Sequence, residues 1–520
     1  MPINLAEPLD WESATGDALT MLEDLQGNIL KGHGRHHTAN LFLNFSGDRG
    51  KVAASLNSIG RQLPSALDQL RDAKAFSETK ISAGRFLSFF ISKEGYGWLG
   101  TPAPVSPARA PHSADATLES MLDRKTALDD PNLPDLDAHF RQDQPEKIIH
   151  ALLLIADDGP EDVEVEASRW TWLLAQDGVS VIGAEYGRAY FNAAKDGLEN
   201  FGYVDGRSQP LMLRQDIAEE GKSLKSGDPA DPDSWEWSPI FPLGQFVVRD
   251  PGGATPHSFG SYFVFRKLEQ DVEGFKEREE ALAKALGLTN SPDPDDAERA
   301  GAMVVGRFEN GSPYTMPKGP WTAPVSPDPS SGPLNNFNFD NDSEGALCPF
   351  RGHIRKTNPR GDSARLPGGT FDEEELGRER SRIMARRGIT YGVRAQNVAR
   401  EFVDRPRQGA GLLFMAYMAN ISEQFEVTQR FWANNAEFVS PPVGIDPVIG
   451  QTANGEGQVW WPDARGAPKK TEFDFGRFVH LKGGEYFFAP SKSFLTNFVF
   501  EPVTAAAEPV SEDASVMTTA

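Results

Sequence analysis

The sequence predicts an α+β fold built from two similar halves, each an antiparallel sheet with helices packed against it. A chain of 520 residues exceeds the size at which one hydrophobic core stops growing. Hydrophobic residues make up 39% of the chain and aromatic residues 10%, which is enough to fill a sizeable core. An alternation of strands and helices also occurs twice. We therefore predict an N-terminal half at 1–215, a C-terminal half at 216–502, and a small, polar, disordered tail at 503–520.

The N-terminal half contains four apolar or alternating segments that are typical of strands. These lie at residues 38–45, 84–92, 147–157 and 179–187. Two segments between them space their apolar residues at three and four positions, as amphipathic helices do. These helices are expected at residues 51–63 and 163–176.

The C-terminal half repeats this order. Residues 258–287 are expected to form a strand that runs into a charged amphipathic helix, and residues 411–435 a second strand followed by a helix. A further strand is expected at 483–491, and an apolar, aromatic run lies within 383–392. Each half therefore has about four strands and two helices, which indicates a duplicated unit.

Charge and cysteine content exclude several classes of protein. A net charge of -23 disfavours nucleic acid and anionic membranes as partners, because both require a basic surface. No apolar run reaches the ~18 residues of a membrane span. The single cysteine, Cys348, excludes an internal disulfide and a cysteine metal cluster. The acidic N-terminus lacks the features of a secretory signal, so we expect a cytoplasmic protein unless the chain is a trimmed form or uses another export route.

The segment FGYVDGRSQP, residues 201–210, holds Asp205 between Gly202 and Gly206. Glycine, aspartate and proline are the usual residues of surface turns, so a turn is the simplest interpretation. A carboxylate held in such a turn would also suit a reaction that needs a proton acceptor at a defined position.

Histidines offer two candidate sites. The cluster HGRHH at 33–37 does not have the spacing of a tight zinc site. His353 lies in CPFRGHIRKTNPR, and residues 351–400 carry 12 Lys and Arg against 6 Asp and Glu, a local net of +6. These arginines could pair with acidic surface residues, or they could bind a ligand with two carboxylates. Haem is such a ligand, and a histidine could bind its iron.

Taken together, these motifs resemble the dye-decolourising peroxidases. The resemblance runs from DLQGNILKGHGR at 24–35 to GGEYFFAPS at 483–491 and covers most of the chain. It rests on the GxxDG motif at 202–206, on the histidine of CPFRGHIRKTNPR and on the arginine of MARRGITYG at 384–392. It implies a ferredoxin-like fold in each half and one non-covalent haem b in the C-terminal half. The inserted loops are typical of a longer member.

The resemblance also implies roles for the two polar sides of a haem site. His353 matches the proximal iron ligand, and Asp446 matches the carboxylate that accepts a hydrogen bond from it. Asp205 matches the distal aspartate and Arg386 the distal arginine. Because Arg387 lies directly beside Arg386, the choice between these two arginines rests on counting back from GITYG.

Three further residues are assigned by the resemblance. Leu412 and Phe414 match apolar residues over the distal face of the haem. Arg355 matches a partner of a haem propionate.

Bulky reductants cannot enter a pocket closed by such apolar side chains, so their electrons must be taken at the surface. Trp432 and Tyr391 match positions where family members carry redox-active aromatic residues, although an aromatic residue in a helix more often serves in packing. The acidic segment FDNDSEG at 339–345 could bind Mn(II), which prefers carboxylates, or it could be a solvated loop.

The function expected from the resemblance is a haem peroxidase that reduces hydrogen peroxide and oxidises dyes and phenolics in one-electron steps. Asp205 would move the proton and Arg386 would stabilise the departing oxygen. Because aspartate is a base only when ionised, with an ordinary pKa of ~3.9, an acidic optimum is expected. The alternatives are a haem-handling protein with little turnover and a structural α+β protein with no cofactor. The sequence does not indicate an oligomeric state.

Overall fold

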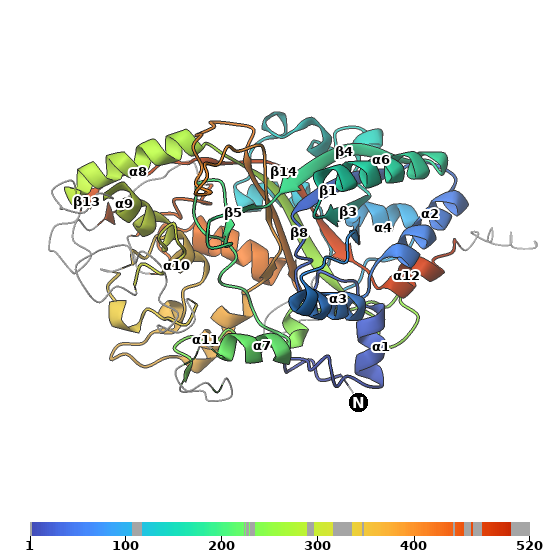
Figure 1. Ribbon diagram of the computed structural model, residues 1–520, viewed down its shortest axis with the longest axis horizontal. Coiled ribbons are helices and arrows are strands. Elements are labelled where there is room, and N and C mark those ends of the chain that lie inside the picture. The colour runs from blue at the N-terminus through green and yellow to red at the C-terminus, as the bar shows by residue number, and fades with distance from the viewer. Residues whose placement is uncertain are drawn as a thin grey trace, which may run out of the picture.

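The computed structural model describes residues 3–106, 117–222, 224, 228, 234–288, 296–315, 335–345, 348–439, 443–451, 459–460 and 471–500. The predicted tail at 503–520 lies outside these residues. One large antiparallel sheet runs through the molecule, with helices on both sides of it (Figure 1). Within the described part of the chain, no helix combines the length and apolar character needed to cross a membrane.

The N-terminal half contributes four strands in the spatial order β2–β3–β1–β4. These strands are β1 (His37–Phe45), β2 (Phe86–Ser92), β3 (Ala151–Asp157) and β4 (Val179–Arg188). The connecting helices are α2 (Arg49–Gln62), α3 (Ala66–Thr79) and α6 (Pro160–Gln176). A β-α-β-β-α-β chain in this order is a ferredoxin-like unit, as expected. Every position of β2 is buried, and all but one of β3, which accounts for their continuous apolar sequences.

The C-terminal half repeats this topology in the order β10–β11–β8–β14. Its strands are β8 (Phe259–Gln270), β10 (Ile389–Tyr391), β11 (Gly411–Met418) and β14 (Val479–Ala489). Its main helices are α8 (Val272–Leu286), α9 (Asp296–Val305) and the π-helix η11 (Ser422–Ala433). A helix was expected after β11, but its π character was not. π-Helical segments are rare and are frequently found at functional sites.

The two sheets expected from the sequence form one continuous sheet. The join is short: Phe487 and Phe488 of β14 pair with Ser92 and Ile91 of β2. A single hydrophobic core cluster includes residues of both halves, from Met21 to Leu495. The halves are therefore similar in topology but share one interior, which holds the C-terminal half in a fixed position against the N-terminal half.

Helix α3 was not expected, although its sequence contains a clear start signal. Ser65 caps the helix by accepting from the backbone N–H of Asp68, whose carboxylate accepts from the N–H of Ser65 in return. This reciprocal capping satisfies two backbone donors that would otherwise lack partners at the helix start.

Two short elements carry polar side chains of the site, α10 (His353–Thr357) and β9 (Ala385–Arg386), and the two-residue strands β5 (Tyr190–Phe191) and β6 (Gly197–Leu198) precede the loop that holds Asp205. The remaining α-helices and strands are α1 (Asp17–Asp24), α4 (Lys93–Leu99), α5 (Met121–Arg124), α7 (Arg214–Gly221), α11 (Glu373–Ser381), α12 (Lys492–Asn497), β7 (Val248–Arg249), β12 (Val459–Trp460) and β13 (Thr471–Glu472).

Candidate active site

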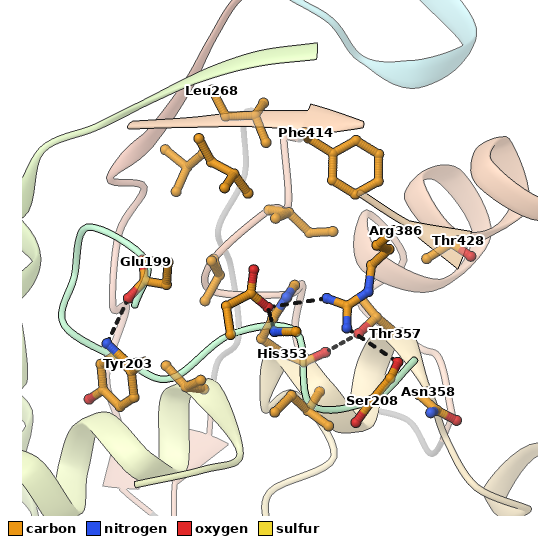
Figure 2. A pocket seen from close by; sticks show the side chains of 18 of the residues that line it. Glu199, Tyr203, Ser208, Leu268, His353, Thr357, Asn358, Arg386, Phe414 and Thr428 are labelled. Carbon is orange, nitrogen blue, oxygen red and sulfur yellow. Dashed lines mark hydrogen bonds and ion pairs between the residues drawn. The ribbon is translucent and has the colours of Figure 1, made fainter. Parts of the chain in front are cut away.

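A cavity of about 230 Å³ opens between the C-terminal sheet, α10 and the loop after β6. Figure 2 shows Leu268 and Phe414 above the labelled polar side chains, with Tyr203 and Arg386 on opposite sides. The cavity therefore has an apolar wall that faces a polar one. It brings together residues from positions 199 to 479 of the chain.

The apolar wall follows from the alternation of side chains in two paired strands. Leu412 and Phe414 of β11 lie two residues apart, so both side chains leave the same face of the sheet and line the cavity. Leu412 pairs with Leu268 of β8, which lines the same wall. The two residues expected over the distal face of a cofactor thus lie side by side at this cavity.

His353 enters the cavity from α10 and is held from behind by a carboxylate. Its Nδ1 atom lies 2.9 Å from Oδ2 of the fully buried Asp446. The other oxygen of Asp446 accepts from the backbone N–H groups of Val448, at 2.7 Å, and Ile449, at 3.0 Å. The carboxylate is therefore fixed by three hydrogen bonds, and the imidazole retains Nε2 as the ring nitrogen that can bind a metal.

Two opposing effects act on the imidazole. Burial lowers the pKa of His353, because it disfavours the charged form, but the Asp446 carboxylate and its hydrogen bond outweigh burial and raise the pKa above its ordinary value. The imidazole is thus held by a strong acceptor, which increases its electron density as a ligand.

Asp205 and Arg386 meet at the polar wall of the same cavity. Nη1 of Arg386 lies 3.4 Å from Oδ1 of Asp205, and Nη2 donates to the backbone oxygen of Ser208 at 3.3 Å. Their side chains are 41% and 32% exposed, so this pair is reached by solvent. The structure thus brings together, around one cavity, the three main residues expected from the sequence.

The GxxDG motif does form a turn, and its glycines are required there. Gly202 has φ 103° and Gly206 has φ 80°, values that strain any residue with a Cβ atom. The backbone N–H of Asp205 donates to the backbone oxygen of Gly197 at 3.0 Å, and the N–H of Gly206 donates to Oδ1 of Asp205 at 2.6 Å. The turn interpretation and the positioned carboxylate are therefore compatible.

The adjacent arginines point in different directions. Arg386, at the end of β9, lines the cavity, whereas the partly buried Arg387 directly after it donates to the backbone oxygens of Asn28, Ile29 and Arg386. Arg387 therefore ties the segment after α1 to the strand that carries Arg386. Of the two, only Arg386 lies where a distal arginine is needed.

Sequence reasoning missed three residues of the cavity wall. Glu199 accepts hydrogen bonds from the backbone of Phe201 and Tyr203, both at 2.9 Å, and from Gln270 at 2.7 Å. Burial raises the pKa of this carboxyl. Tyr203 and Arg307 also line the cavity. Tyr203 lies inside the quoted motif, which was the available signal, but nothing near Arg307 in the sequence distinguishes it from other arginines.

The expectation that Arg355 binds a propionate is wrong. Arg355 is buried away from the cavity, and its guanidinium makes five hydrogen bonds, to both Asp342 and Asp362 and to the backbone oxygens of Cys348 and Asp342. Because all five N–H groups are used within the protein, none is left for a ligand. The place of Arg355 in the motif predicted a positive charge near His353, but it did not predict the direction in which the side chain points.

Trp432 and Tyr391 are not surface residues. Trp432 is buried and stacks on Phe438 with ring centroids 5.2 Å apart. Tyr391 is buried beneath Lys267, whose Nζ lies 5.2 Å from the ring centroid. Neither residue lines the cavity described above. Both side chains pack against neighbouring side chains in the interior, and a role for either in electron transfer stays a prediction.

In the acidic segment at 339–345 and the histidine cluster at 33–37, the side chains considered as metal ligands make other contacts. In the acidic segment, Asp340 pairs with Arg365 and Asp342 with Arg355. His33 stacks on Phe86, and His36 lies against Asp158. Over the described ranges, no three His, Cys, Asp or Glu side chains gather as a metal site would require. The acidic segment therefore does not offer the carboxylate cluster that the Mn(II) prediction needs.

The residues of the cavity fit a haem. His353 offers a nitrogen ligand backed by a carboxylate, as iron-binding imidazoles require. The wall of Leu268, Leu412 and Phe414 suits a flat apolar ring, and the guanidinium group of Arg307 suits a carboxylate group.

Comparisons with known proteins agree with this geometry. No protein-family model matches the chain. The multifunctional dye peroxidase DyP2 of Amycolatopsis sp. is 42% identical over 503 residues, which cover 95% of this chain and 99% of that protein. The dye-decolorizing peroxidase msp1 of Mycetinis scorodonius is 27% identical over 92% of this chain and 88% of its own length.

Solved structures give the same result. The structure of DyP2 from Amycolatopsis superposes with a TM-score of 0.81 at 40% identity, covering 95% of this chain and all 100% of that one. The DyP-type peroxidase of Anabaena sp. superposes with a TM-score of 0.79 at 37% identity, covering 94% and 96%. Identity at this level over nearly the whole of both chains means that this protein belongs to the dye-decolourising peroxidases, a family of haem enzymes.

Proposed function

We propose that this enzyme binds one haem b without covalent links, reduces hydrogen peroxide, and oxidises dyes and phenolics in one-electron steps. The proposal rests on one observation: Asp205 and Arg386 lie 3.4 Å apart at the wall of the cavity that His353 enters. An acid–base group and a fixed cation on one side, with a metal ligand in the same cavity, are the parts that peroxide cleavage needs.

Haem would supply the iron that binds peroxide and the electrons that cleave its O–O bond. Asp205 takes the proton of the bound peroxide on its carboxylate and returns it to the departing oxygen. Arg386 supplies positive charge where that oxygen becomes anionic, and its guanidinium stays protonated throughout. The hydrogen bond from Gly206 to Oδ1 of Asp205 keeps the carboxylate in place without removing its second oxygen from use.

Behind the cofactor, Asp446 holds the imidazole of His353 in one orientation. The backbone N–H groups of Val448 and Ile449 donate to Asp446, so its carboxylate cannot rotate away from the imidazole. A carboxylate in this place raises the electron density of the ligand nitrogen, which favours the oxidised state of a bound iron.

Dyes and phenolics are proposed as reductants because related proteins are named as dye peroxidases. The haem itself would occupy the cavity that His353 enters, which leaves no room beside it for a bulky dye. Such reductants would give up their electrons outside the cavity.

Two experiments test the proposal. Purified holoprotein is expected to show a Soret band that shifts when peroxide is added. Arg386→Leu is expected to retain the band while the shift, followed by stopped flow, slows by about 10²–10³-fold. Arg430→Leu, at an exposed position on η11, serves as the control. A rate for Arg386→Leu equal to that of the wild type would refute the role of this residue.

A haem-handling protein without turnover is the other function considered, and the Asp205–Arg386 pair argues against it, because a carrier needs no distal acid–base groups. A Soret band that does not respond to peroxide would reverse this conclusion.

A further inference from the structure

A buried tyrosine in the cavity wall is hydrogen-bonded to a buried glutamate. Tyr203 lines the cavity, and its phenolic oxygen donates to Oε1 of Glu279 on α8 at 2.6 Å. Glu279 is 2% exposed and belongs to neither the distal pair nor the imidazole and its carboxylate. Figure 2 places Tyr203 on the side of the cavity away from Arg386. This pair therefore contacts the cavity through Tyr203 and lies outside the groups assigned to peroxide cleavage.

The glutamate continues into a short chain of charges that ends at the surface. Nζ of Lys276 lies 3.0 Å from Oε2 of Glu279 and 2.6 Å from Oε1 of Glu309. The side chain of Glu309 is 43% exposed. Nζ of Lys276 also lies 4.9 Å from the ring centroid of Tyr203. One layer of side chains, made by Lys276 and Glu309, thus separates the tyrosine ring from solvent.

We propose that Tyr203 is a one-electron relay between the cavity and reductants at the surface over Lys276 and Glu309, and that Glu279 is the acceptor of its phenolic proton. This inference rests on the proposed peroxidase function, which supplies the oxidant. Electrons from molecules too large to enter the cavity would reach the cofactor through Tyr203.

The step balances in electrons and protons. The peroxide-oxidised cofactor takes one electron from Tyr203, and the O–H bond of the phenol breaks as its proton moves to the carboxylate of Glu279. This leaves a neutral tyrosyl radical beside a neutral carboxylic acid. A phenolic or dye reductant at the surface then gives one electron to the tyrosyl radical, a phenol also releasing its proton to solvent, and the proton on Glu279 returns to the oxygen of Tyr203. Two such rounds, with two protons taken up from solvent as water forms, consume one molecule of hydrogen peroxide.

The surroundings of Glu279 suit a reversible proton acceptor. Burial raises the pKa of Glu279 to about 7, although Lys276 and the Tyr203 hydrogen bond oppose the effect. The carboxylate can therefore accept the phenolic proton near or above this pH, and the relay is expected to fail in acid, where Glu279 is already neutral. A carboxylate with an ordinary pKa would return the proton far more readily. When Glu279 becomes neutral, Lys276 keeps Glu309 as its partner, so the transfer does not leave a buried cation without a counter-charge.

Close packing around the pair limits movement during the transfer. A Cβ atom added at Gly301 of α9 would lie 2.0 Å from the phenolic oxygen and 2.2 Å from Oε1 of Glu279. Such a distance excludes any side chain at this position, so the backbone of α9 closes directly over the hydrogen bond. A proton that moves along a fixed 2.6 Å hydrogen bond needs little rearrangement of its surroundings.

Electron paramagnetic resonance of the holoenzyme, frozen shortly after peroxide is added without reductant, tests the relay. The wild type is expected to give a tyrosyl signal that is lost in Tyr203→Phe. Tyr314→Phe is the matched control: Tyr314 is a buried tyrosine of the same hydrophobic cluster that does not line the cavity, and its variant is expected to retain the signal. A tyrosyl signal that persists in Tyr203→Phe would overturn the proposal.

Glu279→Gln tests the proton acceptor and remains informative if Tyr203→Phe fails to fold. Glutamine keeps an oxygen that accepts from the phenol but cannot take its proton, so the yield of the tyrosyl signal is expected to fall. An unchanged yield would refute the role of Glu279. A wild-type Soret band that does not respond to peroxide would instead refute the peroxidase function, so the two failures are distinguishable.

Discussion

The two polar sides of the active site are built differently. Around His353, the carboxylate of Asp446 is fully buried, lies 2.9 Å from the imidazole and accepts two backbone N–H groups. Around Asp205, the partner arginine lies 3.4 Å away, and both side chains are substantially exposed. One side is a closed arrangement of short hydrogen bonds, and the other is an open pair.

This difference matches what each side has to do. A metal ligand must keep one orientation, which buried and fully satisfied hydrogen bonds provide. A group that exchanges protons must be reachable by solvent and must change its protonation state without breaking a buried ion pair. Rigidity is therefore concentrated around the His353 imidazole, while the reacting side relies on glycine-defined backbone geometry.

The largest expected effect is on the open side. Asp205→Asn keeps the Oδ1 atom that accepts from Gly206, but it can no longer take a proton from peroxide. Turnover is expected to fall by about 10²–10⁴-fold while the Soret band is retained. Asp72→Asn, at an exposed position on α3, serves as the control. If stopped-flow rates with peroxide equal those of the wild type, the open pair has no role in chemistry.

A separate buried network, which Arg355 makes on the helix α10 that also carries His353, should instead show its effect in stability. Arg355→Leu leaves the buried carboxylates of Asp342 and Asp362 without their shared cation. The free energy of unfolding, measured by denaturant titration, is expected to fall by about 3–5 kcal/mol. Arg405→Leu removes an exposed pair with Glu280 at 3.4 Å and is expected to cost at most about 1 kcal/mol. Equal losses for the two variants would contradict the contrast.

Asp446→Asn tests whether the closed side also tunes the ligand. The amide retains an acceptor oxygen but loses the charge that raises the pKa of His353. Activity is expected to fall by about 10–100-fold, with a higher Fe(III)/Fe(II) midpoint potential because the ligand is less electron-rich. A midpoint potential identical to that of the wild type would mean that Asp446 only orients the ring.

The smallest expected effect is on stability, and it distinguishes the strain of a positive φ from steric crowding in the turn that holds Asp205. A Cβ atom at either Gly206 or Gly197 would meet no atom within 4 Å, but only Gly206 has a positive φ, of 80°. Gly206→Ala is therefore expected to destabilise the protein by about 1–2 kcal/mol and to slow peroxide cleavage, whereas Gly197→Ala is nearly silent. Thermal unfolding of both variants checks this, and equal melting temperatures would contradict the argument.

Much of the fold could be predicted, because strands with a buried face have a regular apolar pattern. The expected strand at 38–45 is β1, and the expected strand at 411 begins β11 at Gly411. Helix α3 was missed because its capping signal was not used. The joining of the two sheets could not be predicted, because it depends on four residues of β2 and β14 meeting across the sequence.

The sequence by itself determined the family, the topology of each half and the presence of His353, Asp205 and a distal arginine, because motif residues and apolar spacing are local properties of the chain. The tertiary structure decided where side chains point. It turned Arg386 towards the cavity and Arg387 away from it, and it buried Arg355 among carboxylates. It also placed Glu279 against Tyr203, from segments 76 positions apart. Such contacts depend on packing between distant elements, which no local pattern specifies.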